Sequence, residues 1–275
     1  MRSPLRHLRK LSWAARLGLL LVVLYLMVAV LAPHIAPYGE TQVVGTAFAP
    51  WTETSWLGTD NLGRDMLSRL IYGARNMIFL ALAINILSFV LGGGLGILAA
   101  LQGGWVDQII GRVTDAIMGV PQLILALLLI AIIGNSVPIL IGIIVVLDGT
   151  RVLRLSRAVA MNVVATDYVE AARLRGEGNW WCLWSEVLPN IRTPLMAEFG
   201  IRFCYVFLFI SGLSFLGIGL QPPGADWGSM VRESSVLITF GDFTPLLPAA
   251  AIAVLTISVN FIVDWLIHNN AKARL

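Results

Sequence analysis

Long apolar stretches alternate with short polar ones along the whole chain. Unbroken apolar sequence runs from Leu17 to Leu31, and further apolar runs cover residues 77–101, 113–133, 137–147, 198–220 and 245–267. A helix needs about 20 predominantly apolar residues to cross a bilayer. The fourth run ends early, before Asp148, and we expect its helix to continue to about Val164. The pattern predicts an all-α integral membrane protein with six transmembrane helices.

Composition supports this class and narrows the chemistry. Hydrophobic residues make up 57% of the 275 residues and charged residues only 13%, whereas a soluble domain carries about 25% charge. Neither a Gly-x-Ser-x-Gly sequence nor a phosphate-binding Gly-x-x-x-x-Gly-Lys-[Ser/Thr] loop occurs, and the two cysteines and three histidines show no metal-ligand spacing. We therefore predict no catalytic, cofactor-binding or metal-binding residue, and a protein that is not an enzyme.

The distribution of positive charge predicts the orientation. With the N-terminus inside, 14 Lys and Arg residues fall in cytoplasmic segments and four fall outside, while Arg202 lies within a span. Such a bias favours this topology. It predicts a cytoplasmic basic arm at 1–16, a first helix at 17–36, an external loop at 37–76, five further helices within 77–268 and a cytoplasmic tail at 269–275. The polar loop at 166–190 is then cytoplasmic.

The second half of the external loop is amphipathic. From Gly58 to Arg75 the pattern predicts a capped helix at the outer surface. One face is apolar and the opposite face is charged, with Met66, Leu67, Leu70 and Ile71 on the first and Arg64, Asp65 and Arg69 on the second. We expect the charged face to be solvated.

The loop at 166–190 reads as helix, glycine turn, helix. Asp167 is expected to cap the first helix, with Glu170 completing a pattern like a capping box. Gly176 suits the helix stop, and Asn179 is expected to cap a second helix that ends near Leu188, because a proline follows. Three tryptophans in the second helix suit a membrane–water boundary, namely Trp180, Trp181 and Trp184.

Two groups of motifs in these segments resemble known permeases. Glu170-Ala171-Ala172, then Gly176 and Leu188-Pro189, resembles the EAA loop of ABC-importer permeases, although Glu186 stands where that loop usually has Ile. Two outer segments are similar to dipeptide, oligopeptide and nickel permeases; their characteristic residues are Gly58, Asp60, Gly63, Arg64 and Asp65 in the first, and Gly217, Gly219, Pro222, Pro223 and Trp227 in the second. We expect Pro222-Pro223 to stop a helix and Trp227 to anchor at the outer boundary.

The resemblance implies a C-type permease subunit of a dipeptide, oligopeptide or nickel ABC importer with a MetI-like fold. It implies a bacterial inner-membrane location, a different but homologous second permease, two cytoplasmic ATPase subunits that bind the ATP and dock on the EAA loop, and a periplasmic solute-binding protein. Membrane lipid is a further partner, and nucleic acid is not. The resemblance leaves the solute and the pathway-lining residues open.

Two functions of other classes remain as alternatives. A self-sufficient secondary transporter needs ionisable groups at mid-membrane, but Asp115, Glu198, Arg202 and Asp264 all lie near predicted span ends, and Glu198 and Arg202 form a plain i, i+4 pair. On the fourth predicted helix, Asp148 and Arg151 are spaced i, i+3 and are expected to form an ion pair at the surface. An intramembrane enzyme needs a nucleophile and base inside the bilayer, and no span interior contains histidine.

Overall fold

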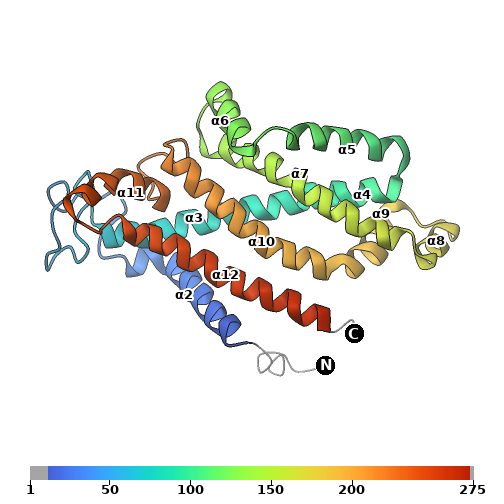
Figure 1. Cartoon of the computed structure of the whole chain (residues 1–275), viewed down its shortest axis with the longest axis horizontal. Coiled ribbons are helices and arrows are strands. Elements are labelled where there is room, and N and C mark those ends of the chain that lie inside the picture. Colours follow the sequence, from blue (N-terminus) through green and yellow to red (C-terminus); the bar gives the residue numbers. More distant parts are fainter. Residues whose placement is uncertain (1–11, 273–275) are drawn as a thin grey trace. The chain divides into compact units, whose positions relative to one another are not determined.

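The computed structural model describes residues 12–272, and its regular structure there is helical (Figure 1). The only extended pairings in this range are two isolated β-bridges in the external loop, Val43 with Arg64 and Thr59 with Asp65. The predicted all-α class is confirmed. The first eleven residues of the predicted basic arm lie outside the described range. The chain divides into two compact units, and the boundary between them falls within helices α3 (Met66–Ser88) and α10 (Leu188–Phe215).

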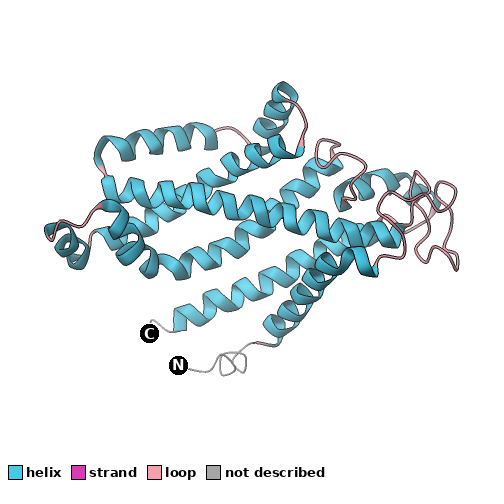
Figure 2. Ribbon diagram, turned by 180° about the vertical axis from the view of Figure 1, so that it is seen from behind, coloured by secondary structure: helices cyan, strands magenta, loops and turns pink. Residues whose placement is uncertain are grey.

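The first unit comprises Met1–Ala81 and Cys204–Leu275. It contains α2 (Trp13–Ile35), the start of α3, the end of α10, α11 (Trp227–Ser234), the 3-10 turn η3 (Ser235–Phe240) and α12 (Leu246–Lys272). Helices α2 and α12 run side by side, as both views show (Figure 1), (Figure 2). Their contact is close because Gly18 lies against α12, where an added Cβ would be 2.5 Å from the carbonyl oxygen of Ser258.

The second unit, Leu82–Phe203, is built around one long helix. This helix, α7 (Val137–Val164), lies along α4 (Gly94–Gln102) and contacts the π-helical turn η1 (Phe89–Gly93). The unit also holds α5 (Gly104–Met118), α6 (Gln122–Ile133), α8 (Asp167–Leu174), α9 (Asn179–Cys182) and the π-helical turn η2 (Leu183–Val187). An added Cβ on Gly92 or Gly96 would overlap backbone oxygens of α7. The two helical segments therefore approach closely at these two glycines, whereas Gly94 faces open space.

Length and apolarity identify four helices able to cross a membrane within residues 12–272. They are Trp13–Ile35, Met66–Gln102, Asn179–Phe215 and Leu246–Asn269, with a fifth if α5 and α6 together form one broken span. Helix α7 has the bounds predicted for the fourth span but carries Asp148 and three arginines. A multi-pass membrane protein follows from these helices, and the count of six spans stays a prediction.

Two predicted elements differ from the structure. The apolar run at 113–133 was expected to form one transmembrane helix, but it is divided between two separate helices, α5 and α6, which are bent by 89°. Pro121 has an extended backbone (ψ 123°) and disfavours helical geometry at Val120, so the first helix ends before it. The external amphipathic helix was expected to stand alone. Its apolar residues instead form the first turns of α3, which begins at Met66 and continues into the second span.

Candidate functional site

The first candidate is the segment at 166–190, which was predicted to be cytoplasmic; we call it the coupling segment after the role that the resemblance implies. Its first helix, α8, has Thr166 at the N-cap, and the Thr166 hydroxyl donates to the carbonyl of Val163 rather than accepting from the helix. The predicted capping box is therefore wrong, because Asp167 is already the first helical residue. Asp167 and Glu170 both lie in the first turn, where their carboxylates are stabilised by the partial positive charge of the helix N-terminus.

The glycine turn is confirmed in detail. Gly176 has φ +90°, and its N–H donates to the carbonyl of Arg173 at 2.9 Å. The N–H of Glu177 donates to the carbonyl of Ala172 at 3.2 Å. These two bonds define a Schellman ending, in which the left-handed residue is usually glycine because it has no Cβ. An added Cβ at Gly176 meets no atom within 4 Å, so backbone conformation is what selects glycine there.

The second helix of the coupling segment differs from its prediction. Its N-cap is Gly178 rather than Asn179, which is the first residue of α9. The chain then passes through η2 into α10, so no helix ends at Leu188. The wide π-helical turn ends at Val187, two residues before Pro189. In a regular α-helix the proline ring would press against the carbonyl of the preceding turn. The result is one continuous rod from the coupling segment into the membrane span.

A buried cluster fixes the coupling segment to the rest of its unit. We call it the coupling core; its members are Ile97 and Leu101 of α4, Ala160 of α7, Ala172 of α8, and Cys182, Leu183, Val187 and Ile191. One polar contact adds to it, since the Arg173 guanidinium donates to the carbonyl of Leu101 at 2.5 Å. The segment is therefore held by packing from both sides of its glycine turn.

The opposite face of the coupling segment is open. Glu170, Ala171, Gly176 and Pro189 are exposed, while Leu188 is half-buried. Ala172 is fully buried in the coupling core and cannot contact another protein. Leu174, which the motif does not include, is 84% exposed. An apolar side chain so far from the core, beside small and acidic residues, forms a surface suited to docking.

The predicted boundary tryptophans lie beside an apolar groove of this unit. Trp180 and Trp184 are exposed and stack edge to face with ring centroids 6.2 Å apart. The groove has a volume of about 470 Å³ and is lined by apolar residues of η1 and α4 and by Leu183, Leu188 and Leu195. This position is consistent with tryptophans at the edge of a bilayer.

The second candidate, in the loop predicted to be external, is a buried ion cluster in the first unit. Asp60 pairs with Arg64, whose Nε lies 2.7 Å from Oδ2, and with Arg69 through the same oxygen. Arg69 also reaches Glu233 of α11 at 3.4 Å. The side chains of Asp60, Arg64 and Arg69 are 2–6% exposed. The prediction of a solvated charged face is wrong, because the charges satisfy one another and tie the external loop to α3 and α11.

The cluster sets the ionisation of Asp60. Burial opposes its charge and by itself raises the pKa of Asp60, but the backbone N–H of Arg64, the charge of Arg69 and the further hydrogen bonds outweigh this effect. The pKa of Asp60 is therefore lowered from its ordinary value of 3.8. Its Oδ1 accepts from the N–H groups of Leu62 and Arg64 at 2.8 and 2.9 Å, so the ionised carboxylate also shapes the turn.

The other residues of the first outer motif support this turn. Asp65 accepts from the hydroxyls of Ser55 and Ser68 at 2.8 and 2.7 Å and from the Ser68 N–H, and it thereby caps α3. Gly58 and Gly63 have φ +75° and +74°, and an added Cβ on either would press on a backbone oxygen of the loop. The motif is therefore a structural signature of the external loop.

The second outer motif is also built for packing. Gly217 has φ +88°, and Gly219 lies so close to Ser214 that no Cβ fits. Trp227 was expected at the outer boundary, but it is 1% exposed, and its indole N–H donates to the carbonyl of Leu70 at 2.9 Å. The burial of the Trp227 indole requires glycine at position 73, since a Cβ added there would lie 2.6 Å from the Trp227 ring.

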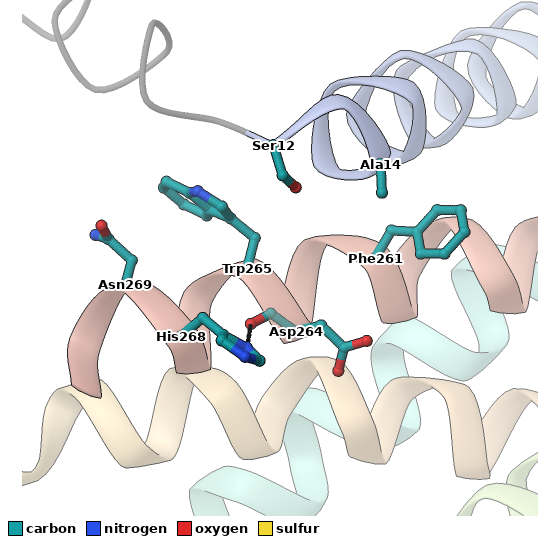
Figure 3. A pocket seen from close by; sticks show the side chains of 7 residues that line it. All are labelled: Ser12, Ala14, Phe261, Asp264, Trp265, His268 and Asn269. Atoms are coloured by element: carbon teal, nitrogen blue, oxygen red, sulfur yellow. Dashed lines mark hydrogen bonds between the residues drawn. The ribbon is translucent and has the colours of Figure 1, made fainter. Parts of the chain in front are cut away.

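A separate hollow of about 520 Å³ lies in the first unit between the start of α2 and the end of α12. Figure 3 shows Ser12 and Ala14 on one side and the side chains of α12 on the other. His268 Nδ1 lies 3.1 Å from the carbonyl oxygen of Asp264, one helical turn earlier. This contact is internal to α12.

Sequence reasoning missed one group of charges in the second unit. The predicted Glu198–Arg202 pair is confirmed at 2.5 Å. The Asp148–Arg151 pair is not formed; Asp148 is 2% exposed and lies 3.7 Å from Arg202, while Arg151 bonds Gln122. No local spacing connects Asp148 with Arg202, because they lie on different long helices.

Comparisons with known proteins agree with the motifs. The model of the family "Binding-protein-dependent transport system inner membrane component" matches residues 92–274. The dipeptide transport system permease protein DppC of Haemophilus influenzae is 32% identical over 264 residues, which cover 94% of this chain and 90% of that protein. A putative peptide transport system permease protein of Brucella suis is 36% identical (95% and 88% covered), and the glutathione transport system permease protein GsiD of Pectobacterium atrosepticum is 28% identical (90% and 83% covered).

Proposed function

Since this chain belongs to the family of binding-protein-dependent transport system inner membrane components, we propose that it is one of two different permease subunits that together form a pathway for peptides. Membership makes it a permease of an ABC importer, a multi-pass membrane protein that works with ATPase and solute-binding components. The proposal adds the composition of the complex and the solute. It places two ATPase subunits inside, a binding protein outside and the chain in a bacterial inner membrane.

One observation carries the coupling role, namely the coupling segment with its buried core and exposed face. Glu170, Ala171 and Leu174 face outward from a helix that Ala172 and Arg173 fix to α4. A docking surface that transmits force needs such support, because a loosely held loop would absorb the movement of its partner. Helix α7 leads into this segment and α10 leads out of it. A displacement of the coupling segment therefore displaces both helices.

The orientation rests on charge. The coupling segment and its flanks are rich in arginine, whereas the external loop has few basic residues, and two of these are buried in the ion cluster. This asymmetry supports cytoplasmic N- and C-termini and a cytoplasmic coupling segment. An ATPase subunit that binds ATP in the cytoplasm then reaches it, and this chain needs no cofactor of its own.

The peptide assignment rests on the relatives. Those from Haemophilus influenzae and Brucella suis carry names of dipeptide or peptide permeases. A small solute such as a nickel chelate is the alternative substrate, and the resemblance of the outer motifs extends to nickel permeases.

The test is reconstitution. The tagged chain is co-expressed with a candidate second permease and ATPase, purified, and placed in liposomes with a binding protein added outside. We expect the ATPase subunits to co-purify and a labelled dipeptide to enter only with ATP inside and the binding protein outside. Parallel assays use a longer peptide, glutathione and a nickel chelate. Uptake by this chain alone, driven by an ion gradient, would show a secondary transporter instead.

A further inference from the structure

Arg202 lies between two carboxylates inside the second unit. Its Nε is 2.5 Å from Oε1 of Glu198, one turn earlier on α10, and its Nη1 is 3.7 Å from Oδ1 of Asp148 on α7. The three side chains are 2–18% exposed. The first contact is a charge-assisted hydrogen bond, whereas the second exceeds hydrogen-bond distance. Arg202 is thus bonded to one carboxylate and close to another.

Asp148 is poorly satisfied in this arrangement. Its Oδ2 has no hydrogen-bond partner within residues 12–272. The side-chain oxygen of Asn85 on α3 also lacks a partner in this range, while its amide nitrogen donates to the carbonyl of Phe199 of α10 at 3.0 Å. A buried carboxylate oxygen without a donor is costly. If the Arg202 guanidinium turns toward Asp148, it supplies the hydrogen-bond donor that the Asp148 carboxylate lacks. The same rotation breaks the hydrogen bond between Arg202 and Glu198.

The two carboxylates respond differently to movement. Glu198 and Arg202 are on the same helix, so displacement of α10 leaves their spacing unchanged. Asp148 is on α7, where its neighbour Gly149 contacts the backbone of Gly92 and holds α7 against η1. Displacement of α10 along α7 therefore changes only the distance from Arg202 to Asp148. Because α10 continues from the coupling segment, that segment controls the distance.

We propose that Arg202 exchanges between Glu198 and Asp148 as the coupling segment moves, and that it is a positioning residue selecting between two arrangements of α7 and α10 during transport. In this exchange one cation, the Arg202 guanidinium, serves the two carboxyl groups in turn. The inference rests on the proposed function, from which it takes the movement of the coupling segment.

The test uses the assembled importer in liposomes and measures ATP hydrolysis before and after addition of dipeptide-loaded binding protein. Asp148→Asn keeps Arg202 on Glu198, and Glu198→Gln favours Asp148. We expect these variants to change unstimulated hydrolysis in opposite directions, each by about fivefold or more, a typical size for coupling between sites. A merely structural ion pair would impair both variants alike, so changes of the same sign, or no change, overturn the proposal.

Two further variants make the test decisive. Asp148→Glu extends the carboxylate toward Arg202 and should shift hydrolysis in the same direction as Glu198→Gln; opposite shifts of these two overturn the proposal even if Asp148→Asn does not assemble. Asp115→Asn neutralises an exposed carboxylate on α5 of the same unit and should behave as wild type. Failure of the unmodified importer to respond to the loaded binding protein would contradict the proposed function instead.

Discussion

At the scale of single residues, two glycines of the coupling segment offer a matched comparison. Gly176 and Gly178 are both exposed, and an added Cβ on either meets no atom within 4 Å, but only Gly176 has a positive φ. Gly176→Val should strain the turn by about 1–3 kcal/mol, too little to prevent membrane insertion but enough to re-aim the docking face. We expect normal expression, lost peptide uptake and weak ATPase co-purification.

Gly178→Val is the control for this prediction, because its φ of −77° suits any residue. It should retain most uptake. Full uptake by Gly176→Val at normal expression would show that the coupling segment does not transmit ATP hydrolysis. The affinity of the binding protein for its peptide should be the same with both variants, since neither residue lies on that side of the proposed pathway.

The lowered pKa of Asp60 leads to a prediction about the stability of the external loop at low pH. Its lowered pKa means that the folded loop favours the ionised carboxylate, so this stabilisation is complete above the ordinary value of 3.8 and is lost as pH falls through the lower folded value. The amides of Leu62 and Arg64, which bond Asp60, should keep their hydrogen-exchange protection at pH 5 and lose it only below about pH 4. Loss of protection between pH 7 and 5 would contradict the buried ion cluster.

The sequence predicted the role of a single residue best where local backbone geometry determines that role. Gly176 was predictable because a helix stop followed by a polar turn favours a left-handed glycine. The capping roles of Asp167 and Asn179 were not, because they depend on which residue first adopts helical angles. The burial of Arg64, Arg69 and Asp148 was also hidden, since their partners Glu233 and Arg202 are distant in the sequence.

At the scale of elements, the contact of η1 with α7 tests how tightly the helices of the second unit pack. An added Cβ on Gly92 would overlap the carbonyl oxygen of Gly149, whereas one on Gly94 meets nothing within 4 Å. Gly92→Ala should therefore destabilise the unit by about 1–3 kcal/mol, the usual cost of overpacking. Gly94→Ala should be neutral or slightly stabilising, because alanine favours helix over glycine.

The measurement is thermal unfolding of the two variants in detergent. Equal melting temperatures for Gly92→Ala and Gly94→Ala would show that η1 does not touch α7 through its backbone.

Apolar periodicity located the long helices but not all of their ends. It placed α7 correctly, since Pro138 and the Gly134–Ser136 turn mark its start. It divided α3 wrongly, because Arg69 interrupts the apolar pattern in the first part of this helix although tertiary contacts bury that residue. It also joined α5 to α6, because composition does not distinguish a kink at Pro121 from a bend of 89°.

At the scale of the whole molecule, the orientation in the membrane is open to direct labelling. In a variant with Cys182 and Cys204, both buried, replaced by alanine, single cysteines are introduced as Glu53→Cys and Arg175→Cys at exposed positions. An impermeant maleimide should label position 53 in intact cells and position 175 only after permeabilisation. The reverse pattern would invert the topology and remove the coupling segment from reach of a cytoplasmic ATPase.

The two π-helical turns also determine where the length of this chain can vary. A turn with i→i+5 bonding holds one residue more than an α-helical turn. Loss of one residue from Phe89–Gly93 or Leu183–Val187 would therefore restore a plain α-helix and leave the faces before and after it in register. Elsewhere in the same rods, a deletion turns every later side chain by about 100°. In an alignment of relatives, single-residue gaps within the long helices should concentrate at these two sites.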